Sequence, residues 1–245
     1  MTAGKMEPMP ALQTAFESIG GIFVMPPLEI AAVLQNCRGV VFDWDGVFNS
    51  GRKGVSTESD FTEADSMGTN MLRYGLWRSM GKLPFTAIIS GENNKSAIRF
   101  AGRECFDSVY TGIKDKRNVI EHLSDQNGVD ARELICVFDD INDLGMAELC
   151  GVRLLVRRDA SPLLRKYATQ RSLCDYVTGS TEFAVREVCE LLLGLLGAHD
   201  DVVQSRVAYD EEYQCYFQAR QAVTTKAFVT RDNMIMEHDA LFPAA

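Results

Sequence analysis

The apolar and polar positions of the chain follow two periods that alternate along its length. Short apolar runs that suit buried strands occur at Gly39–Asp43, Phe85–Ser90, Ser108–Tyr110, Leu134–Asp139, Val152–Val156 and Asp175–Val177. Helical spacing occurs at Leu28–Cys37, Lys95–Gly102, Asp115–Asn127, Leu144–Cys150 and Glu182–Leu196, and also after Ser161, where Pro162 suits a first helical position. Strands that alternate with helices predict an α/β protein, in which helices cover both faces of a Rossmann-like parallel sheet.

The same pattern divides the chain into three parts. Residues 1–26 are expected to form an N-terminal extension, because Gly20-Gly21 and Pro26-Pro27 punctuate its end. Residues 27–199 carry the alternating strands and helices and are predicted to form one domain. Residues 200–245 are expected to form a C-terminal tail that is partly helical.

Aromatic residues recur at helical spacing in this tail, at Tyr209, Tyr213, Tyr216 and Phe217. Such a stripe fits a helix that packs on its own domain. It also fits a subunit contact or a cover over an active site, since exposed aromatic stripes favour interfaces. The sequence leaves these alternatives open.

The composition and charge of the chain bear on which binding partners are expected. The chain has 245 residues, 46% of them hydrophobic, which allows one substantial core. Its net charge is −9 and no stripe of Lys and Arg is present, so a nucleic-acid partner is not expected. No segment has the roughly 20 apolar residues of a membrane helix, and no signal-like apolar run follows the N-terminus, so we expect no membrane partner and a cytoplasmic location.

The seven cysteines are scattered and show no C-x-x-C spacing. Most lie within apolar runs such as ELICVF, AELCGV and REVCELL. This pattern predicts buried, reduced thiols rather than a zinc or redox site.

Carboxylates gather where two of the predicted strands end. Asp43 and Asp45 follow the first strand, and Asp139, Asp140 and Asp143 follow a later one. Ligands of parallel sheets bind outside the carboxyl ends of the strands, so these two groups could meet at one site. Carboxylates packed together repel one another and require a cation, and oxygen ligands suit a hard ion such as Mg²⁺.

The Asp43-x-Asp45 spacing suits a division of labour between two carboxylates. In an extended segment, residues i and i+2 point to the same side. Asp43 could attack phosphorus, while Asp45 protonates the leaving oxygen and then activates water. A lone D-x-D occurs often by chance, but here it follows an apolar strand directly and precedes Gly46.

Four segments resemble, in order, the motifs of the haloacid dehalogenase superfamily. The first is VVFDWDGV, the second ISGENN with Ser90 and Gly91, the third GIKDKRNVI with Lys116, and the fourth FDDINDL. The resemblance extends from about residue 38 to residue 196 and implies an enzyme, a phosphatase.

The resemblance also implies roles for these residues. Asp43 would be the nucleophile that forms an aspartyl-phosphate, and Asp45 the acid and base. The Ser90 hydroxyl, the backbone after it at Gly91, and Lys116 would hold the phosphoryl group. Lys114 lies two residues from Lys116, but Lys116 matches the family position. The Mg²⁺ ligands would be Asp43, the backbone carbonyl of Asp45 and Asp139, with Asp140 and Asp143 orienting the water shell of the ion or Lys116.

A narrower resemblance is to the 3-deoxy-D-manno-octulosonate 8-phosphate phosphatases and related phosphatases of nine-carbon sugar acids. It rests on FDWDGVFNSG, FTEADSMGTNMLRYGL, CDYVTG and AVREVCELLL besides the motifs above. It implies a β-hairpin between Val47 and Phe61 in place of a large cap domain, and a homotetramer whose subunits complete one another's sites.

Several positions depart from this subfamily and leave the substrate open. Glu92 stands where an arginine is common, and Arg157 and Arg158 replace a segment of small residues. These arginines could bind a substrate carboxylate, or they could pair with surface acids. We therefore expect a phosphorylated sugar acid as substrate. The alternatives are another small phosphometabolite, or a binding or oligomerisation module without catalysis.

Overall fold

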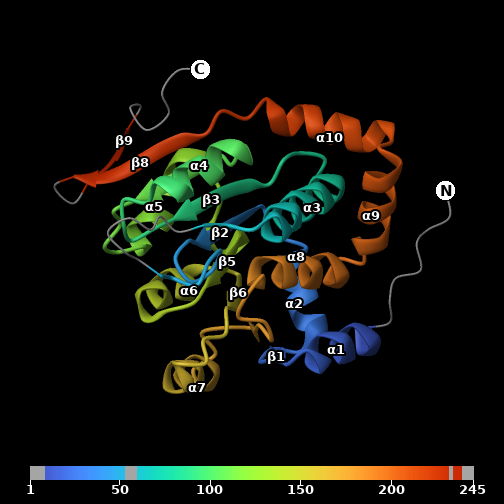
Figure 1. The fold of residues 1–245 in the computed structure, drawn as a ribbon, viewed down its shortest axis with the longest axis horizontal. Coiled ribbons are helices and arrows are strands. Elements are labelled where there is room, and N and C mark those ends of the chain that lie inside the picture. Colours follow the sequence, from blue (N-terminus) through green and yellow to red (C-terminus); the bar gives the residue numbers. More distant parts are fainter. Residues whose placement is uncertain (1–8, 53–59, 232–233, 239–245) are drawn as a thin grey trace.

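The chain folds around one mostly parallel β-sheet with helices on both faces (Figure 1). The computed structural model describes residues 9–52, 60–231 and 234–238. Within these residues the sheet has nine strands in the order β1-β7-β6-β5-β2-β3-β4-β8-β9. Both edge strands, β1 and β9, are antiparallel to their neighbours, and the inner pairings are parallel. The predicted α/β, Rossmann-like fold is thus confirmed.

The chain order places a switch point beside the central strand. The central parallel strands are β2 (Gly39–Asp43), β3 (Phe85–Ile89), β4 (Ser108–Thr111), β5 (Leu134–Phe138), β6 (Val152–Leu155) and β7 (Tyr176–Val177). From β2 the chain adds β3 and β4 on one side, then returns to add β5, β6 and β7 on the other. Ligands of open α/β sheets bind at such a point, outside the carboxyl ends of the strands.

Alternating side chains of the strands build an apolar layer on each face. Val40 and Phe42 point into the layer covered by α1, α2, α3, α4 and α8, whereas Val41 points into the layer covered by α5, α6 and α7. These helices are α1 (Met9–Ser18), α2 (Pro27–Leu34), α3 (Glu63–Met80), α4 (Lys95–Arg103), α5 (Arg117–Asn127), α6 (Leu144–Leu149), α7 (Pro162–Gln170) and α8 (Ala184–Leu195). Burial on both faces explains why the strands read as continuous apolar runs.

The segment before residue 27 takes part in this fold. Helix α1 packs against α8, and β1 (Ile22–Phe23) pairs antiparallel with β7. The ring of Phe23 lies against Tyr176, with the centroids 4.9 Å apart.

The tail packs on the domain that precedes it. Helices α9 (His199–Ala208) and α10 (Glu211–Gln221) lead around α3 to β8 (Lys226–Arg231), which pairs parallel with β4, and to β9 (Met234–Glu237) (Figure 1). The rings of Tyr213 and Tyr216 are buried. Their centroids lie 5.2 and 4.9 Å from the ring centroid of Tyr74 in α3. Of the alternatives for the aromatic stripe, these two tyrosines follow the first, a helix packed on its own domain.

The loop after β2 is described only in part. Residues 45–48 form a turn, and residues 60–62 lead into α3. Of the fifteen residues of the β-hairpin predicted between Val47 and Phe61, seven, residues 53–59, lie outside the described residues.

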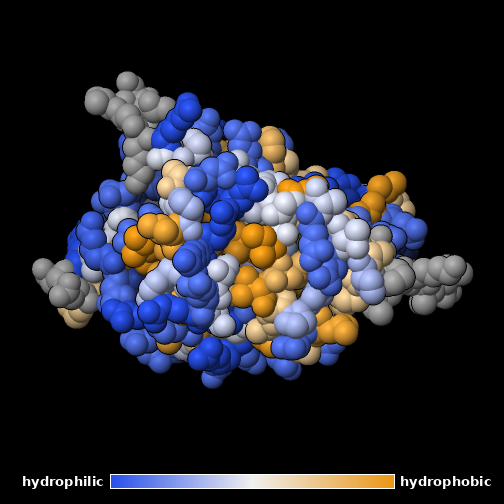
Figure 2. Space-filling view, turned by 90° about the horizontal axis from the view of Figure 1, so that it is seen from below, coloured by the Kyte–Doolittle hydropathy of each residue, from blue (hydrophilic) through white to orange (hydrophobic). Residues whose placement is uncertain are grey.

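On the face seen from below, one apolar group on the left is surrounded by hydrophilic residues, and a larger apolar region extends from the centre toward the lower right (Figure 2). Among the described helices, none combines the length and the apolar character that crossing a membrane requires.

Candidate active site

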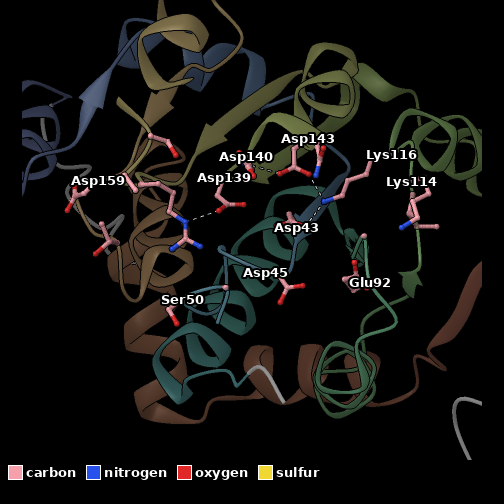
Figure 3. Close-up of a pocket in the computed structure, with 18 residues that line it drawn as sticks. Asp43, Asp45, Ser50, Glu92, Lys114, Lys116, Asp139, Asp140, Asp143 and Asp159 are labelled. Atoms are coloured by element: carbon pink, nitrogen blue, oxygen red, sulfur yellow. Dashed lines mark hydrogen bonds and ion pairs between the residues drawn. The ribbon is translucent and has the colours of Figure 1, made fainter. Parts of the chain in front are cut away.

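A cavity of about 760 Å³ lies at the carboxyl ends of the central strands. The residues that line it come from the ends of β2, β3, β4, β5, β6 and β7 and the segments that follow them. Figure 3 shows that Asp43 and Asp45 face this cavity from one segment, and Lys116 and Asp139 from two others. The sheet therefore brings together residues that lie up to 96 positions apart, from Asp43 to Asp139.

Asp43 is the last residue of β2 and is only 5% exposed. Carboxylate oxygens of Asp43, Asp139 and Asp143 all lie within 4.8 Å of one another. Burial raises the pKa of Asp43 well above its usual range, the ammonium of Lys116 opposes this shift, and the neighbouring carboxylates of Asp143 and Asp139 reinforce it. The predicted meeting of two acidic strand ends is therefore observed.

Lys116 supplies the positive charge of this cluster. It precedes α5, is buried, and forms ion pairs with Asp43 and Asp143 (Figure 3). Burial alone would lower the pKa of Lys116, but the two carboxylates outweigh burial and raise it, so the side chain is an ammonium ion. Lys114, the alternative lysine, is exposed and lines the cavity at its edge.

Asp139 follows β5 and is held by Arg158. The Arg158 Nε donates to the Asp139 Oδ2 at 2.8 Å. Burial raises the pKa of Asp139, and the bond from Arg158 opposes that shift. Gly46 makes this approach possible, because a Cβ at Gly46 would lie 2.0 Å from the Asp139 Oδ2 and 2.3 Å from the Arg158 Nη2.

Asp140 and Asp143 differ in their surroundings. The backbone N–H of Asp140 donates to the Asp143 Oδ2 at 3.2 Å, while Asp143 Oδ1 faces Lys116. Asp143 is buried, whereas Asp140 is exposed and lines the cavity. Asp143 thus connects the loop after β5 to the buried lysine.

Asp45 lies two residues after Asp43 and also lines the cavity. Its carboxylate accepts a hydrogen bond of 3.3 Å from the Asn94 Nδ2. The Asn94 Oδ1 in turn caps α4 by accepting the N–H groups of Ser96 and Ala97. Asn94 was not predicted as a site residue. Its sequence signal is an Asn directly before a helical segment, which is typical of an N-cap.

Ser90 and Gly91 follow β3. Ser90 is fully buried, and its Oγ accepts the N–H of Glu92 at 3.3 Å. Its carbonyl accepts the N–H of Ile113 at 3.1 Å, which ties this loop to the segment before Lys116. Gly91 and Glu92 line the cavity directly.

The structure separates the two predicted substrate arginines. Arg158 lines the cavity, whereas Arg157 is absent from the described lining residues. The Arg157 Nε donates to Asp159 at 2.8 Å, and its Nη1 donates to the carbonyl of Gly179 at 3.3 Å. Arg157 therefore follows the predicted alternative of pairing with a surface acid.

The donor set fits a hard cation. Three buried carboxylates face one lysine, so the cluster keeps an excess of negative charge in a poorly solvated place. Carboxylate oxygens are the ligands that Mg²⁺ takes in proteins. Asp43 and Asp139, both predicted as ligands, belong to this cluster, and Asp143 joins them while it also pairs with Lys116.

Comparison with known proteins gives relatives of one kind. The scan against protein-family models finds no match. The 3-deoxy-D-manno-octulosonate 8-phosphate phosphatase of Escherichia coli K12 is 27% identical over 175 residues, which cover 71% of this chain and 88% of that protein.

Solved structures show the same fold. A hydrolase from Legionella pneumophila assigned to the HAD superfamily, subfamily III A, is 22% identical with a TM-score of 0.61, and covers 74% of this chain and 94% of its own. The 3-deoxy-D-manno-octulosonate 8-phosphate phosphatase from Moraxella catarrhalis, solved with magnesium, phosphate and KDO, is 22% identical with a TM-score of 0.59, and covers 73% of this chain and 98% of its own.

A third structure is the deoxy-D-mannose-octulosonate 8-phosphate phosphatase from Haemophilus influenzae in its cobalt-bound form. It is 24% identical with a TM-score of 0.59, and covers 71% of this chain and 99% of its own. Two of these neighbours thus hold a metal ion. The relatives bear out the predicted enzyme class, a phosphatase. In sequence and in fold the chain is similar to the 3-deoxy-D-manno-octulosonate 8-phosphate phosphatases of the haloacid dehalogenase superfamily, as its four motifs predicted.

Proposed function

We propose that the chain is a Mg²⁺-dependent phosphomonoester hydrolase that acts through an aspartyl-phosphate on Asp43. The observation that carries this proposal is the position of Asp43 at the end of β2, paired with a buried ammonium and within 4.8 Å of two further carboxylates. A carboxylate in a solvated turn would need none of these neighbours.

The side chains divide the reaction as follows. The Asp43 carboxylate attacks phosphorus, and the bond from phosphorus to the ester oxygen breaks. Asp45 gives a proton to the departing oxygen, which leaves as an alcohol. Asp45 then takes a proton from water, the water oxygen attacks the phosphorus of the aspartyl-phosphate, and phosphate leaves as Asp43 is restored.

Charge neutralisation supports both steps. Lys116 lies beside Asp43 and can bind a phosphoryl oxygen, while Asp143 holds the lysine in place. Ser90 and the backbone N–H after it would bind further phosphoryl oxygens. Mg²⁺ held by Asp43, the carbonyl of Asp45 and Asp139 would supply the positive charge that phosphoryl transfer needs. Arg158 would orient Asp139, and Asp140 would contact the water shell.

We further propose a phosphorylated sugar acid as the substrate. The names of the relatives support a sugar phosphate. Arg158 supports a substrate that carries a carboxylate. A guanidinium has five N–H donors, and the bond to Asp139 uses one of them, so donors remain for a substrate carboxylate. Another small phosphometabolite remains the second candidate, favoured by Glu92, a negative side chain in the cavity lining.

The cytoplasmic location and the homotetramer remain predictions. Sedimentation of the purified chain tests the tetramer, and a strictly monomeric chain would count against it. A binding module without catalysis is disfavoured, because such a module has no need to bring Asp43, Lys116 and Asp139 into one cavity.

The test is phosphate release from a panel of phosphorylated sugar acids, sugars and nucleotides, with Mg²⁺ and with a chelator. We expect release that requires the metal and that is highest for one class of sugar phosphate. No release from any ester, by a folded chain shown to bind Mg²⁺, would contradict the proposal.

A further inference from the structure

A second pocket lies directly beside the candidate active site. It has a volume of about 300 Å³ and shares Ser50 and Thr181 with the larger cavity. Three segments form its walls, namely residues 47–50 after β2, 60–62 before α3 and 181–183 before α8. The part of a bound phosphate ester that carries the phosphoryl group can therefore extend from the larger cavity into this pocket.

Phe183 lies in this pocket in an uncommon backbone conformation. Its φ is 56° and its ψ is 29°, in the left-handed region, and half of its surface (50%) is exposed. This region is costly for a bulky side chain, by about 1–3 kcal/mol, and glycine adopts it freely. The half-exposed ring adds little buried area to the fold, and its place in the pocket lining leaves it open to a ligand.

Two buried carboxylates hold the backbone on either side of Phe183. Glu187 accepts the N–H groups of Gly179 and Ser180, both at 2.8 Å. Asp65 accepts the N–H of Arg186 at 2.9 Å. Hydrogen bonds before and after Phe183 thus hold its strained backbone in place, as strained residues at functional sites require.

Asp65 also joins two walls of the pocket. Its Oδ2 accepts the hydroxyl of Thr62 at 2.7 Å, and Thr62 lines the pocket beside Phe61. The segment before α3 and the first turn of α8 are therefore fixed to each other by one buried side chain. The pocket is a built feature of the fold and not a gap between independent loops.

The lining gives the pocket a definite chemical character. Its apolar part is formed by Val47, Phe48, Phe61 and Phe183. Its charged residues are Asp60 and Glu182, and no Lys or Arg is found among its described lining residues. Aromatic rings accept the apolar face of a ring, carboxylates accept hydroxyl groups, and both carboxylates repel an anion.

We propose that this pocket binds the uncharged ring of the sugar that carries the phosphate, and that Asp60 and Glu182 exclude a second anionic group from it. The proposal rests on the proposed function and specifies its leaving group. A carboxylate of a sugar acid would then lie in the larger cavity, toward Arg158, while the hydroxylated part lies on Phe183.

The first test replaces Phe183 by glycine, which removes the ring and relieves the backbone. The matched control is Tyr209→Gly, since Tyr209 is also an aromatic residue with positive φ (49°) and 47% exposure at a helix end, but lies in the tail. The measurement is the ratio of kcat/KM for a hexose 6-phosphate to kcat/KM for ethyl phosphate. We expect Phe183→Gly to lower this ratio about threefold to tenfold, the range that the loss of one aromatic contact gives, and Tyr209→Gly to leave it unchanged.

The second test concerns charge and uses Glu182→Gln. We expect kcat/KM for a hexose bisphosphate to rise severalfold relative to the hexose 6-phosphate, because one repelling carboxylate is gone. If Phe183→Gly and Glu182→Gln still hydrolyse their test esters but leave the ratios of kcat/KM unchanged, the pocket assignment is overturned. The proposed function is then not affected. A larger loss for a nucleoside monophosphate than for the sugar phosphate would assign the pocket to a base instead. No hydrolysis of any ester by the wild type would remove the proposed function, and this proposal with it.

Discussion

Buried charge defines the candidate site at the scale of single residues. Asp43, Asp139 and Asp143 lie within reach of one another, with Lys116 between two of them. Unpaired buried charges are costly, and such clusters are typical of sites with a function. The fold tolerates this arrangement because Lys116 pairs with two of the carboxylates and Arg158 with the third.

Gly46 allows a prediction about this close packing. Its φ is +101°, and an added Cβ would collide with Asp139 and Arg158. We expect Gly46→Ala to lower the free energy of unfolding by about 3 kcal/mol, from backbone strain and overpacking together, and to abolish phosphate release. Thermal unfolding and the phosphate assay measure the two effects.

Gly81→Ala is the matched control for Gly46. Gly81 also has a positive φ (+70°), but an added Cβ meets nothing within 4 Å. This variant should lose about 1 kcal/mol of stability and keep its activity. An active Gly46→Ala enzyme, as stable as the Gly81→Ala control, would contradict the described contact with Asp139.

The sequence predicted that the carboxylates and Lys116 lie at one site. It did not predict the hydrogen bonds that other side chains donate to these carboxylates. Strand ends and family motifs mark Asp43, Asp139 and Lys116, because the proposed chemistry would restrict their residue types. Asn94 acts through Asp45, and Arg158 through Asp139. Such contacts join segments that are distant in sequence, so periodicity and spacing give no sign of them.

At the scale of elements, the apolar strands were predicted closely, whereas α3 and β8 were not. Helix α3 buries small and polar residues such as Asp65, Thr69 and Arg73, which interrupt an apolar helical period. Arg73 is buried because it donates to the carbonyls of Glu104 and Cys105, at 2.6 and 2.9 Å. β8 lies after two helices, and its pairing with β4 depends on the path of the whole tail.

Arg220 is predicted to anchor the tail through a buried ion pair. Its Nη2 donates to the Glu104 Oε2 at 2.7 Å, and both side chains are buried. Arg220→Met would leave the buried carboxylate of Glu104 with only Arg103 and Ser66 as side-chain partners, so we expect a loss of about 1.5–3 kcal/mol in the free energy of unfolding. Denaturant unfolding measures this loss.

Lys226→Met serves as the control, because Lys226 pairs with Glu237 on the surface at 3.4 Å. Exposed pairs contribute little, about 1 kcal/mol at most. Equal stability of the Arg220→Met and Lys226→Met variants would show that the buried pair does not hold the tail.

At the scale of the whole molecule, the proposed substrate has the same sign of charge as the chain. The net charge is −9, and the proposed substrate is an anion. The cavity at the switch point has Lys114, Lys116 and Arg158 among seven carboxylates, so its described lining is also negative. Binding of a phosphate ester would therefore depend on a bound cation and on direct contact with Lys116, and not on a positive field of the whole cavity.

Metal binding should couple to stability in a way that depends on pH. The pKa values of Asp43 and Asp139 are raised in the folded chain, so in the absence of metal their contribution to stability is largest at low pH and is lost as pH rises. Mg²⁺ needs the ionised carboxylates, so its stabilisation grows over the same range. At a concentration 100 times its Kd, Mg²⁺ should add about 2.7 kcal/mol.

The measurement is the melting temperature with Mg²⁺ and with a chelator, at about pH 5 and about pH 8. We expect the shift caused by Mg²⁺ to be larger at the higher pH. Asp139→Asn, which removes one proposed ligand, should reduce that shift. A shift that does not depend on pH, or that persists in Asp139→Asn, would place the metal elsewhere.

The most direct test of the central claim is the site of phosphorylation. The chain is mixed with its best substrate and Mg²⁺, quenched in acid within one turnover, digested and analysed by mass spectrometry. The account predicts one phosphoryl group on the peptide that contains Asp43, and none in Asp43→Asn, which should also fail to release phosphate. Phosphate release by Asp43→Asn at the wild-type rate, or an adduct on another residue, would contradict the assignment of Asp43 as the nucleophile.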